Sequence, residues 1–287
     1  MRARGSIVAT GLAAALCATI VSGARAFDEA KYPNWRGQWS APLAYQFGTN
    51  PSWDQTKAQG LAQQAPLTPE YQALHDASLA DVAAGGAGLD RDFLCITPGM
   101  PRMMNVYSTM EILVLPDTTY MLLGFVNDIR RIYTDGRDWP AVIEPSYAGY
   151  SIGKWIDTDG DGRFDVLEIE TRGFKGPRTL DSTAIPLHED NRTVVKERIF
   201  SDAADRNILH DEITLIDNAF TRPWTVTKQY RRNAQARPLW REAGCVENNA
   251  HTRIGNQDYM LSGDGLLMPA KKDQTPPDLR YFNKARQ

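Results

Sequence analysis

An acidic segment at residues 157–168 has the residue types and the spacing of a calcium-binding loop. In the run DTDGDGRFDVLE, acids stand at the first, third, fifth, ninth and twelfth positions, and a glycine stands at the sixth. Ca²⁺ takes six to eight oxygen ligands, and the glycine permits the sharp turn that points alternate side chains inward. The spacing predicts that Asp157, Asp159, Asp161 and Asp165 bind a Ca²⁺ ion.

The flanks of this loop, residues 151–156 and 166–171, have the pattern of strands, whereas an EF-hand needs a helix on each side. We therefore interpret the loop as the turn of a β-hairpin, in which the ion is a structural support and not a catalytic metal. Glu168 is a poor ligand candidate because an extended chain carries it away from the loop. The alternative is an acidic hairpin tip that binds no metal.

A second candidate site combines two adjacent arginines with aromatic residues. In a strand expected at residues 129–134, Arg130 and Arg131 lie on opposite faces, so at most one points inward, and Tyr133 shares the face of Arg131. An inward arginine is costly unless it is paired or binds an anion, and a guanidinium suits bidentate recognition of a carboxylate.

This pattern predicts a pocket for an aromatic ring and an acid group. Tyr133 or Tyr150 would act as acid or base. The lining would come from Arg130, Arg131, Tyr147, Trp155, Arg222 and Trp224. The alternative is a structural network in which Asp128 and the aromatic residues fix the strand order.

The sequence contains no nucleophile elbow, phosphate loop or H-E-x-x-H motif. Its four histidines are scattered without ligand spacing, and no organic cofactor motif is present. The leading hypothesis is a cofactor-independent enzyme of the lyase or decarboxylase type, acting on a small aromatic or carboxylated compound. The alternatives are a non-catalytic periplasmic binding or carrier protein and a structural envelope protein.

Residues 1–26 have the features of an export signal. The segment begins with two arginines, continues with an apolar run at residues 11–21, and ends in Ala24-Arg25-Ala26, which fits a cleavage site. The apolar run is too short and too rich in alanine for a membrane span. We therefore expect a periplasmic or secreted protein without a membrane anchor.

Loss of the signal would remove three arginines and change the formal net charge from −3 to −6. An acidic chain argues against nucleic acid or an anionic membrane as partner, so a small-molecule ligand is expected. Residues 27–287 contain no repeat, low-complexity tract or linker, and we expect them to form a single β-rich domain.

Two cysteines, Cys95 and Cys245, remain after the predicted cleavage. In an oxidising compartment they are expected to form one disulfide, which would tie the C-terminal tail to the chain before the first strong strand. The alternative, a nucleophilic thiol, needs a neighbouring base that the sequence does not show.

The hydrophobic pattern predicts one helix followed by strands. Thr68 as N-cap and Pro69 at the first helical position begin a helix that stops at Gly85-Gly86. After the helix, apolar residues recur at every second position, as they do in strands. Asp135-Gly136 is the strongest turn signal among these strands. Strands are predicted at residues 111–115, 120–126, 129–134, 151–156, 166–171, 193–200, 208–216 and 224–231. This pattern indicates a mainly β fold, an antiparallel barrel or sandwich, with a loop-rich C-terminal tail.

The run NWRGQW at residues 34–39 has two interpretations. Its Gly-x-Trp is similar to the opening of lipocalins, where it starts the first barrel strand and the tryptophan closes the barrel floor. The spacing from Tyr32 to Gly37 is longer than in that pattern. We favour the second interpretation, an N-terminal arm packed by an aromatic cluster.

The phrases RRIYTDGRDWP, PSYAGYSIGKW and TRPWTVTKQY, with the acidic hairpin, resemble a family of exported proteobacterial proteins that is largely without assigned function. The resemblance extends over almost the whole chain, from NWRGQW to PPDLRYF. It implies an exported, single-domain protein and carries over no catalytic residue. Shorter relatives have a plain turn at the place of residues 157–162, so the resemblance does not imply that the family needs calcium.

Overall fold

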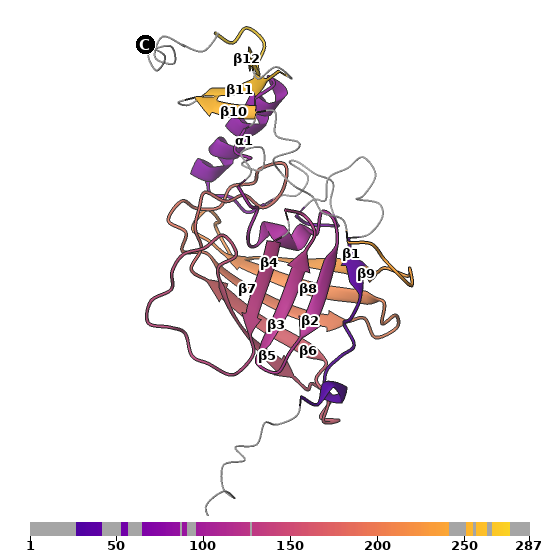
Figure 1. The fold of residues 1–287 in the computed structure, drawn as a ribbon. Coiled ribbons are helices and arrows are strands. Elements are labelled where there is room, and N and C mark those ends of the chain that lie inside the picture. Colours follow the sequence, from indigo (N-terminus) through magenta and orange to yellow (C-terminus); the bar gives the residue numbers. More distant parts are fainter. Residues whose placement is uncertain are drawn as a thin grey trace, which may run out of the picture.

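Nine strands form a closed barrel in which each strand lies next to its successor in the chain (Figure 1). The computed structural model describes residues 27–41, 53–56, 65–86, 88–90, 96–126, 128–240, 251–254, 257–262 and 266–275. The barrel strands are β1 (Gln38–Ser40), β2 (Met110–Val114), β3 (Thr118–Leu123), β4 (Asp128–Tyr133), β5 (Tyr150–Ile156), β6 (Val166–Arg172), β7 (Val194–Ser201), β8 (Ile208–Ile216) and β9 (Trp224–Arg232). The prediction of a mainly β fold is confirmed, and the sheet closes as a barrel. Strands β2 to β9 differ from their predicted bounds by at most three residues.

One pair of neighbouring strands in this otherwise antiparallel barrel, β4 and β5, is parallel, which was not predicted. The pairing is limited to two positions, Ile132 opposite Ser151 and the next pair along. A parallel return needs a long crossover, which residues 134–149 provide. Gly153 permits the close approach of the two strands, because a Cβ there would lie 2.7 Å from Ile132 Cγ2.

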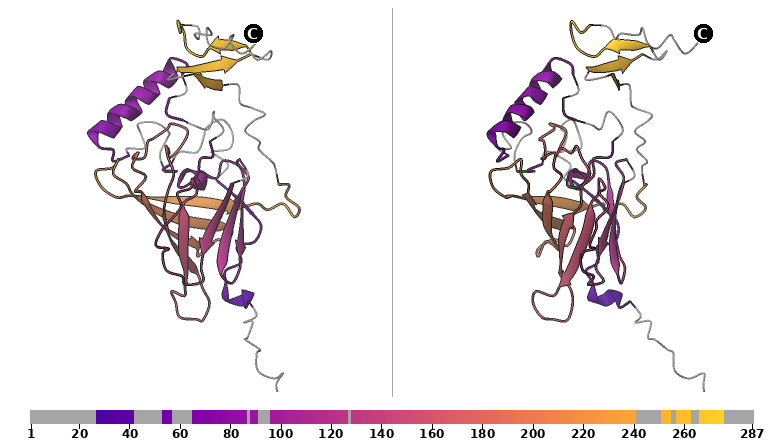
Figure 2. Two further views of the ribbon diagram at one scale, coloured as in Figure 1. Left: turned by 60° about the vertical axis from the view of Figure 1, so that its left-hand side comes forward. Right: turned by 90° about the vertical axis from the view of Figure 1, so that its left-hand side faces the viewer.

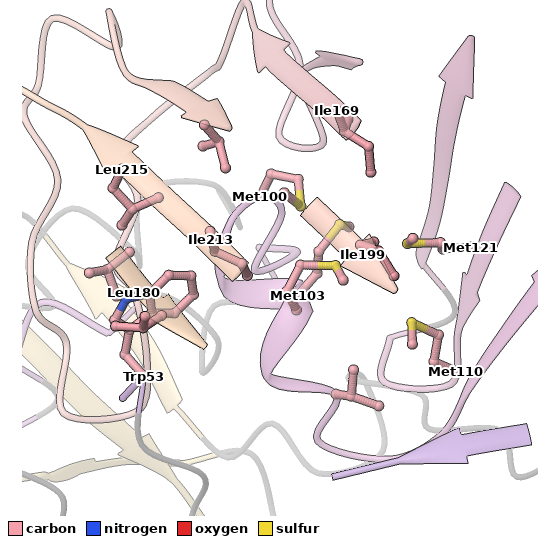
Figure 3. Close-up of a cluster of buried hydrophobic side chains, with 14 of the residues drawn as sticks. Trp53, Met100, Met103, Met110, Met121, Ile169, Leu180, Ile199, Ile213 and Leu215 are labelled. Atoms are coloured by element: carbon pink, nitrogen blue, oxygen red, sulfur yellow. The ribbon is translucent and has the colours of Figure 1, made fainter. Parts of the chain in front are cut away.

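The interior of the barrel is filled by side chains, as is usual for barrels of this size. Residues of each strand alternate between this interior and the outer face. Several buried methionines meet in the centre, from strands and from the short 3₁₀ helix η5 (Arg102–Asn105). Figure 3 shows Met103, Met110 and Met121 among leucine and isoleucine side chains. Methionine is flexible and polarisable, so it fills irregular gaps between strands of different tilt.

Helix α1 (Pro69–Ala83) begins as predicted, because the Thr68 side chain accepts a hydrogen bond from the Tyr71 N–H (3.4 Å). Figures 1 and 2 show α1 at one end of the barrel beside a small sheet. That sheet, in the tail where no strand was predicted, contains β10 (His251–Ile254), β11 (Gln257–Leu261) and β12 (Leu267–Pro269). An ion pair joins Asp81 of α1 to Lys271, just after β12. Within the described residues, no helix is both long and apolar enough to cross a membrane.

The NWRGQW run combines features of both interpretations. Its last residues begin β1 of the barrel, and the rings of Tyr32 and Trp35 pack on Trp155 at 5.3 and 5.0 Å. Trp39 of β1 is completely buried, and its indole N–H donates to the Trp35 carbonyl oxygen (2.9 Å). The preceding 3₁₀ helix η1 (Glu29–Lys31) lies at the end of the barrel opposite α1 (Figure 2). The backbone N–H of Phe164, in the acidic hairpin, donates to the Lys31 carbonyl oxygen (2.7 Å). This N-terminal segment therefore covers the end at which the acidic hairpin lies.

Candidate functional site

Arg130 points into the barrel and Arg131 points away from it. The Arg130 guanidinium is completely buried and forms a bidentate ion pair with Glu197 of β7, with Nη1 2.8 Å from Oε1. Its Nη2 also donates to the Thr171 hydroxyl (2.9 Å). The anion that an inward arginine requires is thus supplied by the protein itself. This geometry favours the structural-network alternative at Arg130, with Glu197 as the acid in place of the predicted Asp128.

A second pair of buried charges lies on β8 and β9, where Asp211 and Lys228 are opposite each other. The Lys228 ammonium donates to Asn105 Oδ1 and to the Trp53 carbonyl oxygen, both at 2.7 Å. Burial lowers the pKa of Lys228 to about 7, against the opposing effect of the Asp211 charge. Burial, together with the charge of Glu197, raises the pKa of Asp211 well above its ordinary value.

These interior charges were not found by reasoning from the sequence, although a signal was present. Glu197 stands between Val195 and Ile199 in the apolar phase of its strand, and Asp211 and Lys228 stand in the same phase of theirs. A charged residue in the buried phase of an alternating strand is unusual and needs a partner. Together with Arg130 they form an internal network of both signs, which we assign to the scaffold.

The two tyrosines predicted as acid or base lie on the outer face of the barrel. The ring centroids of Tyr133 and Tyr150 are 5.0 Å apart. The Arg137 guanidinium stacks on the Tyr133 ring at 3.8 Å, and its Nη1 lies 3.4 Å from the Tyr150 hydroxyl. Arg131 stacks on another outer ring, that of Tyr120, at 5.4 Å. The structure thus brings Tyr133 and Tyr150 together, but on the face opposite to Arg130.

The remaining residues of the predicted pocket are spread over the molecule. Trp155 points into the barrel at the end near the acidic hairpin, and Trp224 points into it at the opposite end. Arg222 is exposed beside Trp224, and Tyr147 lies in the connection between β4 and β5. The sheet order places these side chains on different walls and at different ends, so they do not line one pocket.

The hairpin between β5 and β6 gathers three of the four predicted calcium ligands. Carboxylate oxygens of Asp157, Asp159 and Asp161 lie within 4.8 Å of one another. The backbone N–H groups of Gly160 and Gly162 donate to the Asp157 carboxylate (2.7 and 2.9 Å) and so shape the turn. Because several carboxylate oxygens in a tight loop suit a hard cation, these residues fit Ca²⁺.

The fourth predicted ligand, Asp165, instead ties the two ends of the loop together. Its carboxylate accepts hydrogen bonds from the Thr158 backbone N–H (2.9 Å) and from the Thr158 hydroxyl. Partial burial opposes ionisation, but the bonds from Thr158 outweigh it and keep the pKa of Asp165 below its ordinary value. Glu168 lies on the outer face of β6 opposite Lys154, as expected for an extended chain.

A cleft of about 1080 Å³ opens at the same end of the barrel. Its walls are residues 27–36, the end of β2, the acidic hairpin and the β7–β8 connection. Tyr32 and Phe164 contribute aromatic rings, with centroids 5.1 Å apart. Leu113 and Leu115 remain 42% and 44% exposed in it. A concave, largely apolar surface of this size is typical of small-molecule sites.

Charged side chains of both signs form the rim of this cleft, which is also lined by Asp159 and Asp161. Arg36 is paired with Glu29. Arg163 and Arg206 have no ion-pair partner within the described part of the chain, so both guanidinium groups are available to a ligand.

Residues 1–26 and both remaining cysteines lie outside the described residues. The export signal and the Cys95–Cys245 disulfide therefore stay predictions.

Comparison with protein-family models found no matching family, and comparison with curated proteins found no similar sequence.

Proposed function

We propose that this protein is an exported, non-catalytic small-molecule-binding barrel, and that its ligand lies in the cleft beside the acidic hairpin. The observation that carries the proposal is the cleft itself, in which Leu113 and Leu115 leave an apolar wall open next to two aromatic rings. Burying such a wall is favourable, at roughly 25 cal/mol per Å² of apolar surface. Export to the periplasm rests on the signal predicted in residues 1–26.

Binding is favoured over the lyase or decarboxylase alternative by the positions of the predicted acid and base. Tyr133 and Tyr150 lie on the outer face, and neither lines the cleft. A general acid or base must be within hydrogen-bond reach of the proton that it transfers. Arg130, the other half of that hypothesis, is occupied by Glu197. A carrier or binding protein needs only the cleft.

The proposed function predicts that a charge on the apolar wall weakens ligand binding. Leu113→Glu should lower the affinity for 8-anilinonaphthalene-1-sulfonate and for aromatic carboxylates by about tenfold or more, because a carboxylate must then be desolvated against the ligand. Fluorescence titration of the 27–287 protein measures both. Ile129→Glu is the matched control, since Ile129 is 53% exposed on β4 and does not line the cleft.

Equal affinities in Leu113→Glu and in the wild-type protein would remove the cleft as the binding site. Chemical conversion of a bound aromatic carboxylate during prolonged incubation would restore the enzyme alternative.

We also propose that the acidic hairpin binds Ca²⁺ as a structural ion. Its support is the gathering of Asp157, Asp159 and Asp161 in a turn shaped by Gly160 and Gly162. An ion that binds only the folded chain stabilises it by mass action. The ion would hold the hairpin in place at one wall of the cleft.

Chelation tests the calcium proposal. At free Ca²⁺ a hundredfold above Kd, removal with EGTA is expected to lower the free energy of unfolding by about 2.7 kcal/mol. The double variant Asp159→Asn with Asp161→Asn should lose this dependence, and Asp138→Asn, an exposed acid outside the loop, should keep it. Identical thermal unfolding of the wild-type protein with Ca²⁺ and with EGTA would show that the hairpin tip binds no calcium.

A further inference from the structure

The walls of the cleft come from opposite sides of the barrel. One wall is the end of β2, and another is formed by the acidic hairpin between β5 and β6 together with the connection between β7 and β8. In the closed strand order, β2 is separated from β6 by β3, β4 and β5, and from β7 by β1, β9 and β8. A molecule that fills the cleft therefore meets different strands at its two ends.

The β2 side of the cleft is apolar. It is lined by four consecutive aliphatic residues, Ile112, Leu113, Val114 and Leu115. The side chains of Leu113 and Leu115 are among the exposed large hydrophobic groups of the protein. Because burial of such surface is favourable in proportion to its area, this side suits the apolar part of a ligand.

The opposite side carries two guanidinium groups on neighbouring turns. Arg163 stands just before β6, and Arg206 stands just before β8. Because β7 pairs with both β6 and β8, the two turns leave the same end of the barrel side by side. Both arginines are exposed, and both line the cleft. The cations of the cleft are thus gathered on the side that faces the apolar wall.

The acids that line the cleft are already engaged. Glu29 is paired with Arg36, and the other three acids belong to the acidic hairpin. Two of these, Asp159 and Asp161, are calcium ligands in our proposal, and the third accepts hydrogen bonds within the hairpin. Within the described part of the chain, no ion pair joins any of these acids to the two arginines of the neighbouring turns. The charges left for a ligand are therefore positive.

We propose that the cleft binds an anionic amphiphile, with its oxyanion head group at Arg163 and Arg206 and its apolar body against the β2 side. This inference rests on the proposed function, because it assigns a ligand class to the same cleft. A guanidinium binds carboxylate and phosphate oxygens through two parallel hydrogen bonds, and other oxyanions offer it similar acceptors. The separation of the cations from the aliphatic wall fixes the orientation of the ligand.

Two fluorescent probes with the same aromatic body test the head group. One is 8-anilinonaphthalene-1-sulfonate, and the other, N-phenyl-1-naphthylamine, is the same molecule without the sulfonate. Arg163→Gln and Arg206→Gln are each expected to weaken binding of the sulfonate about three- to tenfold, which corresponds to one hydrogen bond from a partly exposed charged group. Neither substitution should change the affinity for the neutral probe, and its retained binding shows that the variants are folded. Fluorescence titration of the 27–287 protein measures both affinities.

Arg192→Gln is the matched control, because it makes the same change in net charge. Arg192 is exposed, stands before β7 at the other end of the barrel and does not line the cleft. It is expected to leave the affinity for both probes unchanged. An equal loss of sulfonate binding in Arg192→Gln and in the two cleft variants would show a long-range effect of net charge and would overturn the proposal.

The two proposals fail in different ways. If Arg163→Gln or Arg206→Gln bound the sulfonate like the wild-type protein, or weakened both probes equally, the anionic class would be overturned. The binding cleft would stand in that case as long as Leu113→Glu still weakened both probes. Binding of neither probe, or binding that Leu113→Glu leaves unchanged, would overturn the proposed function as well.

Discussion

Arg130→Met is expected to lower the free energy of unfolding by about 3–5 kcal/mol, measured by urea denaturation at pH 7. The substitution removes the only cation that contacts the Glu197 carboxylate directly among the described residues and leaves that carboxylate in a dry interior. Glu197→Leu should lower the free energy of unfolding by a similar amount, because Arg130 would then be the buried charge without a partner. Neither substitution should change the affinity of the cleft for its ligand, since neither Arg130 nor Glu197 lines the cleft.

The double variant Arg130→Met with Glu197→Leu separates pairing from burial. Replacing both charges by apolar side chains of similar volume is often neutral or stabilising. The double variant should therefore regain most of the free energy of unfolding that each single variant loses. Arg131→Met is the matched control on the same strand, and we expect a change within about 0.5 kcal/mol because Arg131 lies on the exposed face. If Arg130→Met were as mild as Arg131→Met, the buried pair would not be holding the barrel together.

The strand pattern could be predicted because a period of two along the chain reports burial on one face. Strand β8 (Ile208–Ile216), with its strict alternation, was predicted with its observed bounds. The parallel return of β5 could not be predicted in this way. Asp135-Gly136 is a local turn signal, but Arg137 binds Asp135 and the chain continues into a long crossover. Which strand lies beside β4 is decided by long-range packing, such as the approach of Ile132 to Gly153.

The candidate site was harder to predict. Alternation along a strand shows which residues share a face, but it does not show which of the two faces points into the barrel. On β4 the two isoleucines are uninformative, since Ile129 is exposed and Ile132 is buried. The sequence therefore left Arg130 and Arg131 equivalent, and only the position of Glu197 on another strand distinguishes them. The cleft was missed for a different reason. Its walls come from segments that lie far apart in the sequence, namely residues 27–36, the end of β2, the acidic hairpin and the β7–β8 connection.

The free energy of unfolding is expected to rise with pH between about pH 7 and pH 10 because of Lys228. Its pKa in the native state is about 7, whereas an unfolded lysine has a pKa of about 10.4. In this range the unfolded chain binds a proton at Lys228 that the native chain has lost, so raising the pH favours the native state. The slope from this residue is at most about 1.4 kcal/mol per pH unit. Urea denaturation at pH 7, 8 and 9 measures it.

Lys228→Met should remove this rise, and Lys154→Met, a substitution on the exposed outer face, should keep it. The acids that face Lys228 are Asp211, Asp181 and Asp54, and their charges oppose the effect of burial on its pKa. Asp211 acts with the opposite sign at pH values between its unfolded and its native pKa. Its raised native pKa means that the native state holds a proton that the unfolded chain has released, so stability falls with rising pH until that pKa is passed. A wild-type slope above pH 7 that persists unchanged in Lys228→Met would assign the titration to another group.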